Sequence, residues 1–70
     1  MTKAEFSFIV NCVAGDMVAY LMEDRGISMQ EALDVVYQSE TYQKLQEKST
    51  GLYRNSSAYT YEYLLRELAV

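Results

Sequence analysis

Apolar residues near the start of the chain recur with the spacing of one face of an α-helix. They fall three and four residues apart along the first 25 positions: Phe6, Ile9, Val10, Val13, Met17, Tyr20 and Leu21. This pattern predicts a helix over residues 3–25. Thr2 and Glu5 fit a capping box at its start, in which each side chain accepts a hydrogen bond from the other residue's backbone amide. Gly26 can take the left-handed conformation that commonly ends a helix.

The predicted first helix is apolar around more than one face. Further residues widen its apolar surface beyond the first stripe: Phe8, Cys12, Val18, Ala19 and Met22. A helix with water on its far side normally carries polar residues there. We therefore expect this helix to be central in the fold or paired with another chain. Cys12 is expected to be a buried small hydrophobe. Gly15 is either simply tolerated or marks the close approach of another helix backbone.

Two shorter helices are expected next. Ser28 begins a second capping box, and the apolar face that follows predicts a helix to about residue 38. Ser39 is typical of a fresh N-cap, so a third helix is expected to run to about residue 48. Tyr42 and Leu45 should face the core from this third helix.

The C-terminal part of the chain is divided by turn residues. Leu52 and Tyr53 lie between two turns and are expected to form a buried anchor or a short extended or helical segment. The last helix is expected over residues 57–68. The alternating tyrosines of residues 59–65 also have the period of a strand, but a lone strand would have no pairing partner. The helix is therefore favoured.

These elements predict an all-α fold, a compact bundle of three to four helices in a single domain over residues 1–70. A chain of this length buries a limited apolar area, and such domains often depend on disulfides, metals or a partner chain. Cys12 is the only cysteine and histidine is absent, which excludes an internal disulfide and argues against a structural metal. We therefore expect self-association or a protein partner, and no cofactor.

The charge of the chain narrows the classes of partner. Ten acidic and six basic residues give a net charge of −4. Nucleic acids and anionic membrane surfaces attract Lys and Arg, so the balance argues against both. No stretch is expected to approach the length of a membrane-spanning helix, and the N-terminus lacks the pattern of a secretory signal. The single cysteine and the missing export signal predict a cytoplasmic protein.

The sequence also lacks the usual residues of enzyme chemistry. Without histidine the commonest general base is missing, and Cys12 lies far from a helix N-terminus that would lower its pKa. The neighbouring carboxylates Glu23 and Asp24 are expected to be solvated, as are Glu31 and Asp34. No glycine cluster suggests a phosphate loop. We therefore predict that the chain is not an enzyme.

Two regions are candidates for a protein interface. On the first helix, Phe8 and Met22 extend the apolar surface beyond the core-facing stripe. In residues 51–57, Tyr53 and Arg54 stand beside hydrogen-bonding side chains, a composition enriched at binding hot spots. The alternative that we favour for this segment is that Tyr53 fills the end of the core while Arg54 pairs with a local carboxylate.

The tyrosines of the last helix are a third candidate. Tyr59, Tyr61 and Tyr63 cannot all face one core, so at least one should be exposed or lie at an interface. Tyr59 and Tyr63 flank the predicted apolar face and are the candidate interface residues.

Short motifs give the chain a resemblance to known proteins. Phe8-Ile9-Val10-Asn11-Cys12 lies in the opening helix, Gly26-Ile27-Ser28 starts the second, and a tyrosine-bearing stretch precedes a Glu-containing C-terminal helix. In these features the chain resembles a group of small helical bacterial proteins classed as domains of unknown function, often found in gut anaerobes. Some members are encoded beside toxin-like proteins, so the resemblance implies an antitoxin-like or partner-protein role. It assigns no functional residue, and the family's histidine-bearing C-terminal segment is missing here.

The sequence predicts a small cytoplasmic protein-binding module, an adaptor or antitoxin-like partner of another protein, that forms a homodimer through its first or last helix. One alternative is a DNA-binding transcriptional regulator with a helix-turn-helix around Ser39. The charges of the third helix, including Glu40 and Glu47, make a poor face for phosphates. The other alternative is a small-ligand-binding domain with a pocket lined by Tyr and Met.

Overall fold

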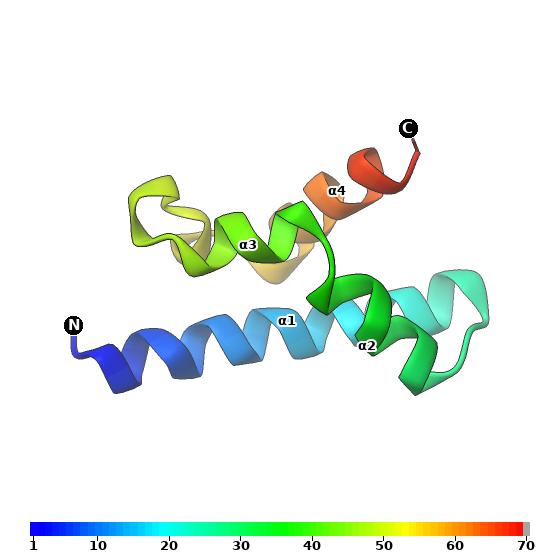
Figure 1. Cartoon of the computed structure of the whole chain (residues 1–70), viewed down its shortest axis with the longest axis horizontal. Helices are drawn as coiled ribbons and strands as arrows, with labels where there is room; N and C mark the ends of the chain where they lie inside the picture. Colours follow the sequence, from blue (N-terminus) through cyan, green and yellow to red (C-terminus); the bar gives the residue numbers. More distant parts are fainter. Residues whose placement is uncertain (70) are drawn as a thin grey trace.

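Four α-helices and two short 3-10 turns form the computed structural model of the chain, which describes residues 1–69 (Figure 1). In chain order they are α1 (Lys3–Arg25), α2 (Met29–Tyr37), α3 (Glu40–Gln46), η1 (Lys48–Thr50), η2 (Leu52–Arg54) and α4 (Ser57–Leu68). No strand occurs among the described residues, and the tyrosines of residues 59–65 lie in α4. The all-α prediction is confirmed, and the strand alternative is wrong.

The ends of α1 follow the local sequence signals. Glu5 N donates a hydrogen bond of 3.1 Å to Thr2 Oγ1, and Thr2 N donates one of 2.8 Å to Glu5 Oε1. Gly26 follows the helix with φ 62°, and its amide donates to the Met22 carbonyl. The left-handed backbone costs glycine little because it has no Cβ. The predicted boundaries of α1 are confirmed at both ends.

The next two helices begin where their caps were predicted, but α3 ends early. Ser28 caps α2 with a capping box, and Ser39 Oγ accepts from Tyr42 N at the start of α3. The third helix was expected to reach about residue 48, yet it ends at Gln46. Thr50 Oγ1 donates to the carbonyls of Lys44 and Glu47, which closes a turn against the last turn of α3. A local polar contact therefore replaces the final helical residues.

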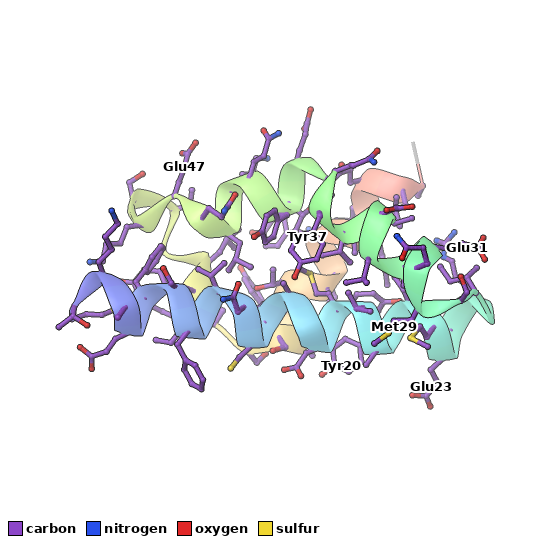
Figure 2. The ribbon with its side chains drawn as sticks, turned by 60° about the horizontal axis from the view of Figure 1, so that its bottom comes forward. Tyr20, Glu23, Met29, Glu31, Tyr37 and Glu47 are labelled. Carbon is purple, nitrogen blue, oxygen red and sulfur yellow. The ribbon has the colours of Figure 1, made fainter. Side chains whose placement is uncertain are left out.

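α1 runs the length of the molecule, with α3 and α4 along one side of it and α2 crossing its C-terminal half (Figure 1). In the second view, α2 and α3 lie on the same side of α1 (Figure 2). The molecule measures 36 × 22 × 19 Å, and its long axis lies along this helix. All four helices and η2 contribute to one core: Val10, Val13, Ala14, Met17, Val18, Leu21, Ala32, Val36, Leu45, Leu52, Tyr53, Tyr61 and Leu64. The members from α1 recur at three- and four-residue spacing, so they form one stripe of the helix.

The length and composition of α1 overturn one sequence expectation. The sequence was expected to contain no stretch approaching a membrane-spanning helix, but α1 has 23 residues and is long and apolar enough to cross a membrane. Core helices of soluble proteins meet the same test, and α1 packs against α2, α3 and α4 here. Only 33% of its most apolar stretch is buried, however. Much of the apolar surface of α1 therefore lies outside the core.

Candidate functional site

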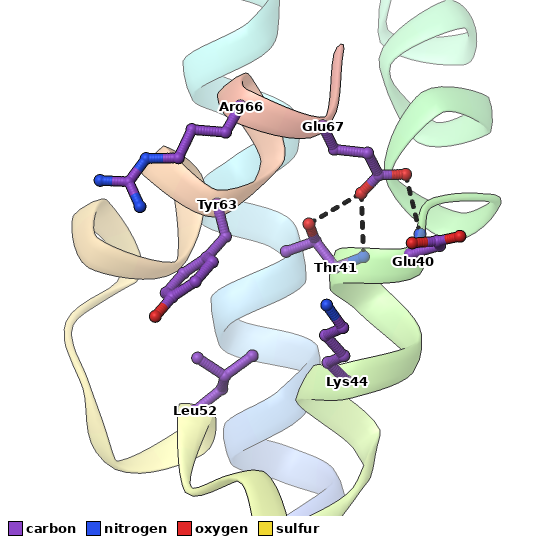
Figure 3. Close-up of a pocket in the computed structure, with 7 residues that line it drawn as sticks. All are labelled: Glu40, Thr41, Lys44, Leu52, Tyr63, Arg66 and Glu67. Carbon is purple, nitrogen blue, oxygen red and sulfur yellow. Dashed lines mark hydrogen bonds between the residues drawn. The ribbon is translucent and has the colours of Figure 1, made fainter. Parts of the chain in front are cut away.

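A groove of about 500 Å³ opens between α3 and α4. One wall is formed by α3 and the other by α4, with Leu52 of η2 at one end (Figure 3). The lining residues are Glu40, Thr41, Lys44, Leu52, Tyr63, Arg66 and Glu67. Tyr63 and Leu52 point toward one another and give the groove an apolar end. A volume of this size is within the range of ligand and peptide pockets.

Glu67 fastens the two walls of this groove together. Glu40 N donates to Glu67 Oε2 at 2.9 Å, while the amide and the hydroxyl of Thr41 donate to Glu67 Oε1 at 3.0 and 2.8 Å (Figure 3). Burial alone would raise the pKa of this carboxyl, but these hydrogen bonds and the nearby Lys44 outweigh it and lower the pKa. Glu67 is therefore a charged anchor for the N-terminus of α3.

Tyr59, Tyr63 and Arg66 form a row on the outer side of α4, next to the groove. The Tyr59 and Tyr63 rings pack edge to face with centroids 5.4 Å apart, and their hydroxyls lie 3.3 Å apart. The Arg66 guanidinium lies 5.7 Å from the centroid of Tyr63. Tyr59 and Tyr63 are 45% and 37% exposed. The hydrogen bond to Tyr63 raises the pKa of the Tyr59 hydroxyl, so this hydroxyl is neutral at physiological pH.

The third tyrosine of this helix lies in the core. Tyr61 is buried, and its hydroxyl donates a hydrogen bond of 2.7 Å to Asp24 Oδ2 at the end of α1. Burial, followed by this hydrogen bond, raises the pKa of Tyr61 to about 12. The prediction that at least one of the three tyrosines is exposed is confirmed. Tyr59 and Tyr63 are the exposed members.

Tyr53 and Arg54 do not form an exposed pair. Tyr53 is buried, and its ring packs edge to face on Phe6 with centroids 5.0 Å apart. The favoured alternative that Tyr53 fills the end of the core is confirmed. Arg54 is exposed, but its Nε donates to the Tyr53 hydroxyl at 3.0 Å and not to the expected local carboxylate. Of these two candidate interface residues, only Arg54 is exposed to solvent.

The outer face of α1 carries the remaining predicted residues. Phe8 is 69% exposed, and Met22 is half-buried against the core. Cys12 was expected to be a buried hydrophobe and is exposed, so that prediction is wrong. Each helical residue turns by about 100°, and this places Cys12 well away from the buried stripe that contains Val10 and Ala14. Among the described residues, a Cβ at Gly15 would meet no atom within 4 Å apart from its chain neighbours and its own helix backbone.

The acidic residues and the single cysteine form no metal site in the described part of the chain. In residues 1–69, no group of three or more His, Cys, Asp or Glu is placed to hold a metal ion. The paired carboxylates at Glu23 and Asp24, and at Glu31 and Asp34, are exposed as expected. One buried polar atom, Thr60 Oγ1, has no hydrogen-bond partner among these residues. The conspicuous side chains are therefore aromatic, apolar and cationic ones at the surface.

Sequence reasoning missed the groove because its residues come from separate segments. Lys44 has the sequence surroundings of a solvated face, and Arg66 only flanks the apolar side of the last helix. One local signal was present at the site where Glu67 binds. The N3 position of α3 is Tyr42, so α3 lacks the acidic residue that completes the capping boxes of α1 and α2. The Glu67 carboxylate, from elsewhere in the chain, instead accepts from the next two amides of α3, those of Glu40 and Thr41.

Comparisons with known proteins give no relative for this chain: no family model, no curated protein and no solved structure matches it. The resemblance to small helical bacterial proteins therefore stays a prediction. Function has to be argued from the surfaces described above.

Proposed function

We propose that the chain is a small protein-binding module, an adaptor that recognises its partner through the outer side of α4 and the adjoining groove. The observation that carries this proposal is the exposed row of Tyr59, Tyr63 and Arg66 at the edge of the α3–α4 groove. Tyr and Arg are the residues most enriched at the centres of protein interfaces, with Trp. Nothing in the packing of the core requires them at these exposed positions.

The side chains of the row contact one another within the chain. The two tyrosine rings support each other through their edge-to-face contact, and Arg66 rests on Tyr63. Ordering flexible side chains at an interface costs about 0.5–1.5 kcal/mol for each one. A row that is already held in place loses less of this freedom on binding. The arrangement therefore suits recognition better than three isolated exposed side chains would.

The charges near the groove favour one class of partner surface. Residues 1–38 carry six acidic and two basic residues, whereas residues 39–70 carry four of each. Two of these basic residues, Lys44 and Arg66, line the groove from opposite walls, and the Glu67 carboxylate there is already engaged with α3. We propose a partner that places carboxylates against Arg66 and an apolar side chain between Tyr63 and Leu52.

Affinity capture with matched tyrosine variants tests the proposal. Tagged wild-type protein is used to capture interacting proteins from its source cells, alongside Tyr63→Ala and Tyr37→Ala. Tyr37 is 45% exposed on α2, so its variant removes a comparable tyrosine outside the proposed surface. We expect one stoichiometric protein with wild type and with Tyr37→Ala, and its loss with Tyr63→Ala. Equal capture by all three proteins would contradict the proposal.

A charge variant tests the chemistry of the partner. Arg66→Glu keeps a long side chain on an exposed position but reverses its charge. Binding of the captured partner should fall by at least about tenfold, because a partner carboxylate would then face a carboxylate. Lys3→Glu, in the first turn of α1, is the control with the same change in net charge at an exposed position.

A further inference from the structure

We infer that the outer face of α1 binds a second copy of the chain, with the two α1 helices parallel. This inference concerns a surface separate from the α4 surface proposed above and does not depend on it. The face consists of Phe8, Cys12, Gly15, Ala19 and Met22. These residues are spaced by four, three, four and three positions, which is the heptad spacing of a coiled-coil seam. We call these five residues the α1 seam.

Most of the α1 seam is uncovered among the described residues: Phe8, Cys12, Gly15 and Ala19 are exposed, and Met22 is half-buried against the core. In Figure 2, α2 and α3 lie on one side of α1, and the Phe8 side chain is 69% exposed. Gly15 is at the middle of the seam and is open to solvent. Glycine inside a helix is less favourable than alanine, because it loses more backbone freedom on folding. A second helix backbone that packs closely at Gly15 would give this residue a structural role that the single chain does not give it.

The charges along the two edges of the seam set the orientation of the second copy. At about 100° per residue, Glu5, Asp16 and Glu23 lie along one edge, and Ser7, Asn11 and Arg25 lie along the other. An antiparallel pair related by a twofold axis brings like edges together, so the acidic edges would meet. A parallel pair places the acidic edge of one copy against the edge of the other copy that carries Arg25. The parallel arrangement therefore avoids the repulsion and is the one that we propose.

The same edge argues for a protein partner over a lipid bilayer. Insertion of α1 would bring Asp16 and its neighbours on the acidic edge into hydrocarbon, where carboxylates are costly. Asp16 is also tied to the rest of the fold, because Ser57 Oγ donates a hydrogen bond of 2.6 Å to its Oδ2. A coiled-coil seam buries only its central residues and leaves its edges in water. The second copy thus covers Phe8 without removing the charges from solvent.

Sedimentation equilibrium of wild type and two single variants tests self-association. Phe8→Ala removes the largest side chain of the seam, and Met29→Ala removes an apolar side chain that is 59% exposed on α2 and is not part of the seam. Both positions are exposed, so circular dichroism should show the same helix content in all three proteins. We expect a dimer for wild type and Met29→Ala, and a dimer dissociation constant raised about 10- to 100-fold for Phe8→Ala.

Cysteine cross-linking tests the orientation. In a parallel pair Cys12 lies beside Cys12 of the other copy, so mild oxidation should give a disulfide-linked dimer that Cys12→Ser abolishes. Ala19→Cys in the Cys12→Ser background should also cross-link to itself. In an antiparallel pair, residue 19 of one copy lies near residues 11 and 12 of the other. Cross-links would then form only when the two single-cysteine proteins are mixed, and this would overturn the parallel arrangement.

Three other results would overturn the inference. They are a monomer at every concentration, a wild-type dimer that Phe8→Ala does not weaken, and co-sedimentation of the protein with neutral phosphatidylcholine vesicles that depends on Phe8. None of these results would contradict the α4 proposal, because the α4 surface and the α1 seam have no residue in common. Conversely, Tyr63→Ala is expected to lose the captured partner while it still forms the dimer. This result would show that the two surfaces bind independently.

Discussion

The Glu67 side chain on α4 accepts hydrogen bonds from both the amide and the hydroxyl of Thr41, at 3.0 and 2.8 Å, and so caps α3 from across the fold. The contact joins residues 26 positions apart in the chain. It fixes the distance between the two walls of the proposed binding groove. The groove therefore depends on a charged carboxylate, and this makes its stability sensitive to pH.

Replacement of Glu67 tests this link. Glu67→Gln should lower the free energy of unfolding at pH 7 by about 1–2 kcal/mol, because hydrogen bonds to a charged acceptor are stronger than those to a neutral one. The pKa of Glu67 is lowered in the fold, so its contribution is present above the ordinary glutamate pKa of about 4.3 and is lost as pH falls through the lower folded value. Urea unfolding at pH 7 and at acidic pH measures both effects.

The control for this prediction is Glu62→Gln, which changes an exposed carboxylate on the same helix. It should leave unfolding at pH 7 nearly unchanged. A difference between wild type and Glu67→Gln that is as large in acid as at neutral pH would contradict the electrostatic explanation.

The contribution of Tyr61 to stability should have the opposite pH dependence and decrease at alkaline pH. Its pKa is raised to about 12, so the folded state holds the phenol proton more tightly than the unfolded chain does. The stabilisation is complete below the ordinary tyrosine pKa of about 10 and is lost as pH rises toward the folded value. Tyr61→Phe should cost about 1 kcal/mol at pH 7 through loss of the hydrogen bond to Asp24. In urea unfolding at alkaline pH, wild type should lose the part of its free energy of unfolding that Tyr61 contributes, and Tyr61→Phe should not. Tyr37→Phe, at an exposed tyrosine, should behave as wild type.

Thr60 predicts a substitution that stabilises the chain. Its hydroxyl is fully buried in α4 without a partner among the described residues. Replacing it by a methyl group in Thr60→Val removes the cost of keeping that hydroxyl from water, so the free energy of unfolding should rise by about 1 kcal/mol. Thr41→Val is the matched control and should destabilise, because the Thr41 hydroxyl donates to Glu67. A destabilised Thr60→Val would show that its hydroxyl has a partner in solution.

Substitution of Gly15 should change the stability of the single chain and its self-association in opposite directions. A Cβ at this position would contact no other element of the described residues, so Gly15→Ala should raise the free energy of unfolding of the dilute monomer by about 1 kcal/mol. At concentrations where the chain self-associates, the added methyl group should weaken the dimer. Gly26→Ala is the contrasting change, since φ 62° there strains any residue with a Cβ. Stronger self-association of Gly15→Ala would argue against close packing at the seam.

Local signals were sufficient to predict most of the fold. The caps at Thr2, Ser28 and Ser39 each bind their own first turn, so the information lies within a few residues. Cys12 was misplaced because α1 is apolar around most of its circumference, and composition then gives no indication of which side faces the core. The core stripe is set by the packing of α2, α3 and α4 on α1, which local patterns do not contain.

The proposed binding surface was predictable only in part. The exposure of Tyr59 and Tyr63 followed from helical geometry, because three tyrosines two residues apart cannot share one face. Their stacking with Arg66 and the groove beside them depend on how α3 and α4 come together. Glu67 provides that connection through a contact that no local motif encodes. The partner itself leaves no sign in the chain beyond the chemistry of this surface.

Photo-cross-linking in the source cells tests the central claim, that the outer side of α4 binds a protein. A photoreactive phenylalanine analogue replaces Tyr63 in one variant and Tyr37 in another, two exposed tyrosines on different helices. A single cross-linked protein species is expected from position 63 and none from position 37. No cross-link from position 63, or the same cross-linked species from both positions, would contradict the claim.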